Sequence, residues 1–401
     1  MVEFSLEKVY EAHSVLSKIA RKTDLNRSTY FSGKNEIYLK TENLQLTGSF
    51  KLRGAYYKIS KLSKEEKQKG VIACSAGNHA QGVALAAKEN KIKATIFIPS
   101  SAPLSKIEAT KSYGAEVCLV DGVYDDAYAE AVKFQEKTGG IFIHPFDDID
   151  VIAGQGTIAL EILDQIPDVD AIVVPIGGGG LISGVAATIK QIKPDCKVYG
   201  VQTQSIPSMF ASIAYNQRTS LDYTYTFADG TAVKFPGELT FQLCKQYVDD
   251  VFTSREDETA SAVLALMEKE KLVAEGAGAL SVSACLFDKI PLENKKVVCI
   301  ISGGNIDFNI LSRVVTSALI KTNRLSNLSI YLTDKPGELA NISSIIAREG
   351  ANIIEVNRDY SSFSAVNGCC LRISLETRNN EHLQAVKSAL IKNGYEVNLS
   401  N

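Results

Sequence analysis

One lysine stands where its side chain could react. Lys51 lies in the stretch TGSFKLRGA (residues 47–55), after a Thr-Gly-Ser turn and before apolar residues that recur with helical spacing. With Ser49 as the predicted N-cap, Lys51 falls in the first turn of a helix, where the helix dipole disfavours a cation. Burial beside Phe50 would also favour the neutral amine, which can form a Schiff base with an aldehyde. The alternative is an ordinary surface lysine that extends into water.

Three strand-like segments run directly into glycine-containing loops that open helices. These loops are CSAGNHAQG (74–82), PIGGGGLISG (175–184) and ISGGNID (301–307). Such loops lie at the carboxyl ends of strands, where ligands bind in open α/β sheets. Backbone N–H groups of the run 177–180 and of Leu181 can surround a phosphate, although a mobile turn is the alternative. The spacing matches neither a Walker loop nor a dinucleotide motif. Pyridoxal phosphate, an aldehyde that carries a phosphate, would use both this loop and Lys51.

The surrounding pattern predicts how these loops are positioned. Short β-branched segments alternate with amphipathic helices over most of the chain, which predicts an α/β fold with parallel sheets covered by helices. After Leu325 the order becomes βαββαβ, typical of a small ferredoxin-like module. We therefore expect a catalytic domain at 1–322, with a smaller subdomain at about 48–150, and a separate domain at 326–401.

Composition excludes several classes of function. The 401 residues carry a net charge of −3, so no broad basic field would attract nucleic acid or a membrane surface. No secretory signal and no apolar run long enough to span a bilayer is found. The eight cysteines show no metal-ligand spacing and no secreted disulfide framework. We expect a cytoplasmic protein with reduced thiols.

Six motifs, in chain order, resemble the threonine/serine dehydratases of the fold-type II pyridoxal-phosphate enzymes, which have a tryptophan synthase β-like fold. They are TGSFKLRGA, SAGNHAQGVA, GGGGLISG, ADGTAVK, EGAGAL and SGGNID, and the resemblance covers roughly residues 6–321. The C-terminal segment, with TDKPGELANI at its first strand–helix turn, resembles an ACT domain, a small amino-acid-sensing module. The whole arrangement resembles the medium-length form of the threonine ammonia-lyases, which carries one ACT domain.

The resemblance implies how pyridoxal phosphate is held. Lys51 forms the Schiff base with the cofactor and later moves the α-proton of the substrate. Phe50 packs on one face of the cofactor ring and Gly230 lies near the other. Asn78 hydrogen-bonds the ring hydroxyl, and Ser302 faces the pyridine nitrogen, whose weak protonation suits β-elimination. The phosphate is held by Gly177, Gly178, Gly179, Gly180 and Leu181.

The resemblance also assigns the loop that binds the substrate carboxylate through backbone N–H groups. This loop consists of Ser75, Ala76, Gly77, Asn78 and His79. For His79, a capping or core role is an equal alternative, since backbone donors alone could bind the carboxylate. Glu275, in EGAGAL, lies either near the cofactor ring or at a helix cap.

The implied reaction is dehydration and deamination of L-threonine to 2-oxobutanoate and ammonia, and of L-serine to pyruvate. Regulation by an amino-acid or nucleotide effector through the ACT domain, and a homodimer or homotetramer, are implied as well. A β-replacement enzyme such as cysteine synthase is disfavoured, because those enzymes carry Asp-Arg after the lysine where this chain has KLR. Two more classes compete with the dehydratases: a serine racemase and a non-catalytic amino-acid sensor. Whether the reaction serves isoleucine biosynthesis or threonine breakdown stays open.

Two positions help to separate these classes. Serine racemases place a serine where this chain has Ala76, and a methyl group cannot transfer a proton to the second face of the substrate. Related enzymes place a carboxylate cation ligand where this chain has Gln202, and an amide is a poorer ligand for a divalent cation. We therefore expect elimination without racemisation and no divalent metal.

Overall fold

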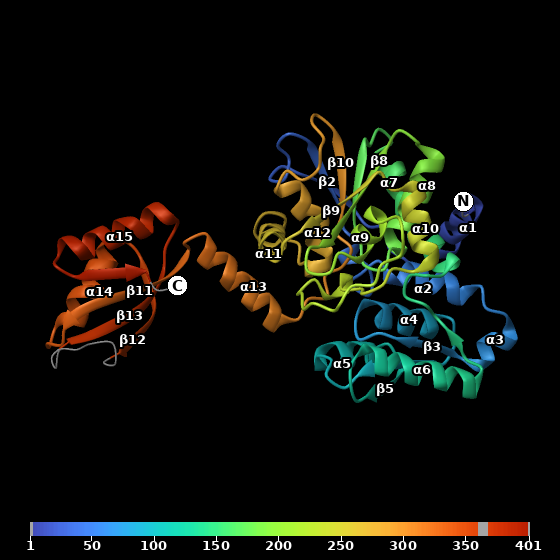
Figure 1. Ribbon diagram of the computed structural model, residues 1–401, viewed down its shortest axis with the longest axis horizontal. Coiled ribbons are helices and arrows are strands. Elements are labelled where there is room, and N and C mark those ends of the chain that lie inside the picture. Colours follow the sequence, from blue (N-terminus) through green and yellow to red (C-terminus); the bar gives the residue numbers. More distant parts are fainter. Residues whose placement is uncertain (1–2, 360–367, 400–401) are drawn as a thin grey trace. The chain divides into compact units, whose positions relative to one another are not determined.

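The computed structural model describes residues 3–359 and 368–399. Parts of the two expected domains, at 1–2, 360–367 and 400–401, lie outside the described residues. The chain divides into two compact units, Met1–Ile310 and Leu311–Asn401. Figure 1 shows the elements of both.

The larger sheet of the first unit has six strands in the order β1-β2-β10-β7-β8-β9. The strands are β1 (Leu25–Ser28), β2 (Glu36–Lys40), β7 (Ala171–Pro175), β8 (Lys197–Thr203), β9 (Asp250–Ser254) and β10 (Lys296–Ile300). All neighbours are parallel except β1, which pairs antiparallel with β2. Every residue of β7 is buried, as expected for a strand covered on both faces. The predicted parallel sheet is confirmed, whereas β1 and β9 were not predicted.

The smaller sheet has four parallel strands in the order β5-β4-β3-β6. The strands are β3 (Val71–Cys74), β4 (Ala94–Pro99), β5 (Glu116–Val120) and β6 (Ile141–Phe142). Helices α4 (Asn78–Glu89), α5 (Leu104–Ser112) and α6 (Tyr124–Thr138) lie beside this sheet in Figure 1. Its core is aliphatic, with Val71, Ile96 and Ile98 packed against Val83 of α4.

Further helices complete the first unit. They are α1 (Leu6–Leu16), α2 (Lys51–Ser60), α3 (Lys64–Lys69), α7 (Ile149–Gln165), α8 (Gly180–Ile192), α9 (Ser208–Ala214), α10 (Glu238–Tyr247), α11 (Glu256–Ala265) and α12 (Gly276–Leu286). Short turns of other helix types are η1 (Glu42–Leu44), η2 (Asp229–Thr231) and η3 (Leu266–Glu270). Helices α7 and α8 approach backbone to backbone, since a Cβ added to Gly184 would lie 2.3 Å from the Ile152 carbonyl oxygen.

Helix α2 begins at Lys51, as predicted, but Ser49 does not cap it. Phe50 occupies the N-cap position with a helical backbone, and no side chain makes a capping hydrogen bond there. The backbone of Ser49 instead pairs with Gly303, and the Phe50 N–H donates to the Ser302 carbonyl at 3.1 Å. The prediction of a Ser49 cap was wrong because this pairing ties the start of α2 to the loop after β10. The buried Ser49 hydroxyl is left without a partner.

The second unit has the predicted βαββαβ order, which follows helix α13 (Phe308–Lys321). Its elements are β11 (Leu325–Thr333), α14 (Glu338–Arg348), β12 (Asn352–Asp359), β13 (Gly368–Glu376), α15 (Asn380–Lys392) and β14 (Glu396–Leu399). The sheet is antiparallel, in the order β12-β13-β11-β14. Leu328 and Ile330 of the sheet pack with Ile342 of α14 and Leu383 of α15.

Among the helices of residues 3–359 and 368–399, none combines the length and the apolar character needed to span a membrane.

Candidate active site

The amine of Lys51 is held in a partly buried site at the N-terminus of α2. Its Nζ donates to the Pro145 carbonyl at 2.7 Å and lies 5.3 Å from the centroid of the Phe50 ring. The backbone of this turn packs against Gly82 of α4, where an added Cβ would lie 3.0 Å from the Lys51 carbonyl carbon. Burial lowers the pKa of the Lys51 amine to about 8, although the charge of Glu275 opposes this shift. A neutral, nucleophilic amine is therefore populated near neutral pH.

The glycine loop between β7 and α8 has no room for side chains. A Cβ on Gly178 would lie 2.3 Å from the Phe146 ring, and Gly179 has a φ of +97°. The Gly178 carbonyl is fixed by the Thr240 hydroxyl, which donates to it at 2.7 Å. Within the described part of the chain, no N–H group of residues 177–180 has a hydrogen-bond partner. These N–H groups, at the N-terminus of a 13-residue helix, are donors for an anion such as a phosphate.

A chain of amide and carboxylate bonds fixes the side chain of Asn78. Asn305 Nδ2 donates to Asn78 Oδ1 at 2.7 Å and to the Thr47 carbonyl at 2.7 Å. Asn78 Nδ2 in turn donates to Glu275 Oε1 at 2.6 Å. A Cβ on Gly303 would lie 2.4 Å from Glu275 Oε1, so a side chain at this position would displace the Glu275 carboxylate. Sequence reasoning gave Asn305 no role, although it stands within the SGGNID motif.

Glu275 occupies the N-cap position of α12, yet its side chain makes no capping hydrogen bond. The buried carboxylate points to Asn78 instead, which favours the first of the two predicted placements. Burial, together with the nearby charge of Asp229, raises the pKa of Glu275 to about 7. Asp229 itself pairs with Lys106 of α5 at 2.5 Å. This salt bridge connects the smaller-sheet helices to η2 beside the site.

The imidazole of His79 is buried, and its Nε2 lies 2.7 Å from the Ile143 carbonyl oxygen. Burial and the positive charge of Lys51 lower the pKa of His79 to about 3, so the ring is neutral. A core role for this side chain is therefore favoured over a charged contact with substrate. Ser75 Oγ accepts the Gly77 N–H at 3.1 Å, which orders the loop but engages one of the predicted donors. Ala76 packs against the core of the smaller sheet.

The remaining predicted residues lie at the ends of strands and loops around these groups. Ser302 follows β10 and is buried, with its carbonyl bound by the Phe50 N–H. Gly230, in η2, lies next to the glycine loop, because a Cβ on Gly177 would be 3.1 Å from the Gly230 carbonyl oxygen. The same glycine faces Glu275, whose Oε1 would be 3.5 Å from a Cβ on Gly230. Leu181, in the first turn of α8, is buried in the hydrophobic core.

The arrangement fits a ligand that carries both an aldehyde and a phosphate. The nucleophilic amine of Lys51 suits the aldehyde, and the unpaired N–H groups of the glycine loop suit the phosphate. The described residues contain no group of three or more His, Cys, Asp or Glu side chains that could hold a metal ion. His144, which has no role predicted from the sequence, accepts the Asp147 N–H through Nδ1 at 2.7 Å and so helps to shape the loop around Pro145.

Comparisons with known proteins agree with this assignment. A family model described as pyridoxal-phosphate dependent enzyme matches residues 16–303. The L-threonine ammonia-lyase of Thermotoga maritima is 48% identical over 398 residues, which cover 98% of this chain and 99% of that protein.

Solved structures are similar over more than three quarters of the chain. The processed form of threonine deaminase isoform 2 from Solanum lycopersicum is 39% identical, covers 78% of this chain and 93% of its own, and has a TM-score of 0.74. Maize serine racemase is 35% identical, covers 79% of this chain and 98% of its own, and has a TM-score of 0.75.

Proposed function

The chain belongs to the pyridoxal-phosphate-dependent enzymes and, within them, to the threonine ammonia-lyases, and from this premise we propose how its residues act. It is a lyase that uses pyridoxal phosphate to deaminate L-threonine. The observation that carries the assignment of residues is the nucleophilic amine of Lys51 together with a glycine loop that can bind phosphate. When bound, the cofactor withdraws electrons from the substrate α-carbon, so that its proton can be lost.

We propose that Lys51 binds the cofactor aldehyde and, once released by the substrate amine, accepts the α-proton. The lowered pKa of Lys51 serves both tasks, because only the neutral amine is a nucleophile and a base. The phosphate is held by Gly177, Gly178, Gly179, Gly180 and Leu181. Phe50 and Gly230 flank the ring, Ser302 faces its nitrogen, and Asn78 donates to its hydroxyl, with its amide oriented by Asn305 and Glu275.

The substrate carboxylate is proposed to bind at the loop 75–79, where the 12-residue helix α4 begins at Asn78. Ala76 offers no group that can return a proton to the second face of the α-carbon. Loss of the β-hydroxyl is then the productive outcome, giving 2-oxobutanoate and ammonia from threonine and pyruvate from serine. The similarity to maize serine racemase makes racemisation the competing activity to test.

The test is product analysis with the purified enzyme. L-Threonine should yield equal amounts of 2-oxobutanoate and ammonia, and L-serine should yield pyruvate with little D-serine on a chiral column. D-serine formed as fast as pyruvate would contradict the proposed elimination specificity.

We propose that the C-terminal unit regulates the enzyme. In this proposal the catalytic domain is residues 1–322, with a subdomain at about 48–150, and the ACT domain is residues 326–401. The βαββαβ order of this unit supports the proposal, as does Gly337, which lies within the turn DKPGEL and caps α14 with a φ of +97°. N–H groups at this turn suit the carboxylate of an amino-acid effector, with isoleucine the first candidate. Removing the residues after Thr322 should leave deamination intact and abolish the effector response. A response that persists would contradict the assignment.

We also propose a cytoplasmic homodimer or homotetramer.

A further inference from the structure

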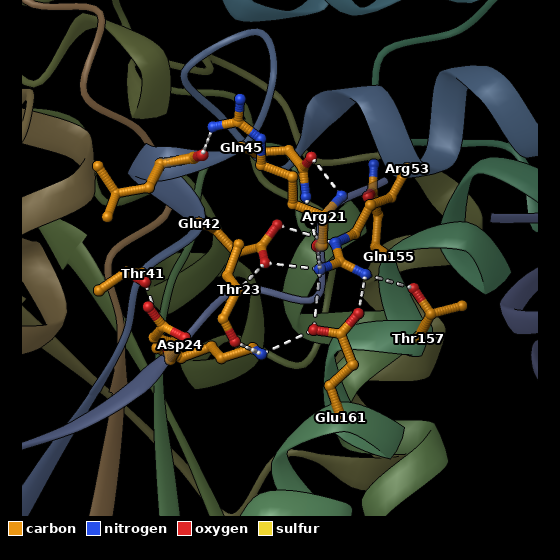
Figure 2. A network of polar contacts seen from close by, with 12 residues as sticks. Arg21, Thr23, Asp24, Thr41, Glu42, Gln45, Arg53, Gln155, Thr157 and Glu161 are labelled. Carbon is orange, nitrogen blue, oxygen red and sulfur yellow. Dashed lines mark hydrogen bonds and ion pairs between the residues drawn. The ribbon is translucent and has the colours of Figure 1, made fainter. Parts of the chain in front are cut away.

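Four buried charged side chains form a network behind helix α2, shown in Figure 2. They are Lys40 at the end of β2, Glu42 in η1, Arg53 in α2 and Glu161 in α7. Each side chain is at most 5% exposed. Burying charged groups costs desolvation free energy. The proposed reaction uses none of these residues, so the network needs another explanation.

Arg53 is the centre of the network, and all three of its guanidinium nitrogens donate (Figure 2). Toward Glu42, Nε donates to Oε2 and Nη2 to Oε1, both at 2.8 Å. Toward Glu161, Nη1 donates to Oε1 at 2.6 Å and Nη2 to Oε2 at 3.0 Å. Arg53 thus binds two carboxylates at once, each through two bonds. Nη1 also donates to the Thr157 hydroxyl, and Nη2 to the Arg21 carbonyl.

The network is balanced in charge, with two positive and two negative groups. Lys40 Nζ pairs with Glu161 Oε2 at 2.7 Å and donates to the Thr23 carbonyl at 2.7 Å. Burial lowers the pKa of the Lys51 amine and the charge of Glu275 opposes this shift, and no charge of the network contributes to either effect. The influence of the network on Lys51 is therefore one of geometry and not of charge.

Helix α2 and its neighbour α7 approach each other closely on the side of Gly54, the residue next to Arg53. The two helices meet through glycines, since a Cβ on Gly154 would lie 2.6 Å from the Gly54 Cα. Apolar side chains of α2, such as Tyr57 against Ile152 of α7, hold the helix in the core, and the bonds of Arg53 to two carboxylates add directional contacts to this packing. Arg53 is two positions from Lys51, which places the side chains about 200° apart around the helix. A small rotation of α2 would therefore move the Lys51 amine away from its place beside Pro145.

We propose that Arg53 is a positioning residue for Lys51: by binding Glu42 and Glu161 together, it fixes the rotation of α2 and so holds the Lys51 amine in the site. The two carboxylates come from different elements, one from the chain that follows β2 and one from α7. Only a planar guanidinium offers two parallel donor pairs at once, so lysine cannot replace it.

Two variants test this inference, which rests on the proposed role of Lys51. Arg53→Lys keeps the positive charge but loses the planar guanidinium and its paired N–H donors. The double variant Arg53→Met/Glu42→Gln removes one charge of each sign, so no unbalanced charge stays buried. The matched control is Lys289→Met/Glu258→Gln, which removes a 2.6 Å salt bridge between α11 and the loop after α12, away from α2.

The readouts are kcat and KM for L-threonine and the rate at which cofactor-free protein binds pyridoxal phosphate at Lys51. In the second assay the amine condenses with the aldehyde with loss of water. Borohydride then reduces the C=N bond, and mass spectrometry of the Lys51 peptide measures the product. We expect the folded Arg53 variants to lose about tenfold to a hundredfold in kcat with little change in KM, and to label more slowly by a similar factor. The control should change neither quantity.

If the Arg53 variants lose thermal stability but keep kcat and the labelling rate, the inference is overturned. If the double variant does not fold, Arg53→Lys decides alone. Failure of the proposed function is distinguishable, because wild-type protein would then carry no label at Lys51.

Discussion

The lowered pKa of Lys51 makes a quantitative prediction about how its reaction with an aldehyde depends on pH. The perturbation is a series of pH values applied to cofactor-free protein, and the measured quantity is the initial rate of pyridoxal phosphate attachment. Because only the neutral amine reacts, this rate should rise with pH and level off above the pKa of the amine. With a pKa of about 8, the midpoint of the rise should lie near pH 8.

The size of the effect follows from the fraction of neutral amine. Near pH 7, about a tenth of an amine with pKa 8 is neutral, against about three parts in ten thousand at the ordinary value of 10.5. Lys51 should therefore react roughly 300-fold faster than an ordinary lysine of the same nucleophilicity.

The same shift affects folding stability with a defined sign. The folded-state pKa of Lys51 lies below that of the unfolded chain, so the unfolded state binds more protons between about pH 8 and 10.5. The penalty for burying the charged amine is complete below pH 8 and fades as the pH rises toward 10.5. Lys51→Met should therefore stabilise cofactor-free protein at pH 7, by up to about 3 kcal/mol in denaturant unfolding.

The assay is trapping by borohydride at each pH, followed by quantification of the Lys51 peptide. Glu275→Gln provides an internal check, because the charge of Glu275 raises the pKa of Lys51 and its loss should shift the midpoint to lower pH. A midpoint near 10.5 in wild-type protein would contradict the lowered pKa of Lys51. So would a Glu275→Gln midpoint that moves to higher pH.

Three other outcomes are expected. Gly178→Ala should weaken cofactor binding and destabilise the protein by about 1–3 kcal/mol, because the new methyl group would meet the Phe146 ring. The control is Gly33→Ala, which has open space around it and should change neither cofactor affinity nor melting temperature appreciably. Ala76→Ser should produce detectable D-serine from L-serine while slowing pyruvate formation. If a chiral column shows no D-serine, residue 76 does not face the substrate α-carbon as proposed. EDTA should leave activity unchanged, because the side-chain oxygen of Gln202, at the position of the cation ligand in related enzymes, already accepts the Phe210 N–H at 2.8 Å. A loss of activity in EDTA that magnesium restores would contradict this.

The parallel sheets, the helix at Lys51 and the glycine loop after β7 were predictable because each is encoded in a continuous stretch. Strands β1 and β9 were missed because they are short edge strands with polar residues, LNRS and DVFTS, and so lack the apolar run that marks a buried strand. The Ser49 cap was predicted from residue type alone. Pairing of the Ser49 backbone with Gly303 prevented it, and that pairing joins segments far apart in the chain.

Contacts that depend on tertiary structure were beyond sequence reasoning. Asn305 and Glu275 orient Asn78 from positions 227 and 197 residues away. Glu161 reaches Arg53 from 108 residues away, and nothing in the local pattern of either residue indicates the partner. The His79 ring contacts the carbonyl of Ile143, 64 residues away, so the sequence could offer a core role only as one of two alternatives.

Locating the cofactor on the protein tests the role of Lys51. Purified wild-type protein should absorb visible light, lose that band on treatment with borohydride, and carry the reduced cofactor on the peptide that contains Lys51. Lys51→Ala should fold, show no such band and form no 2-oxobutanoate from L-threonine. Cofactor found on another lysine, or full activity in Lys51→Ala, would show that Lys51 is not the amine of the reaction.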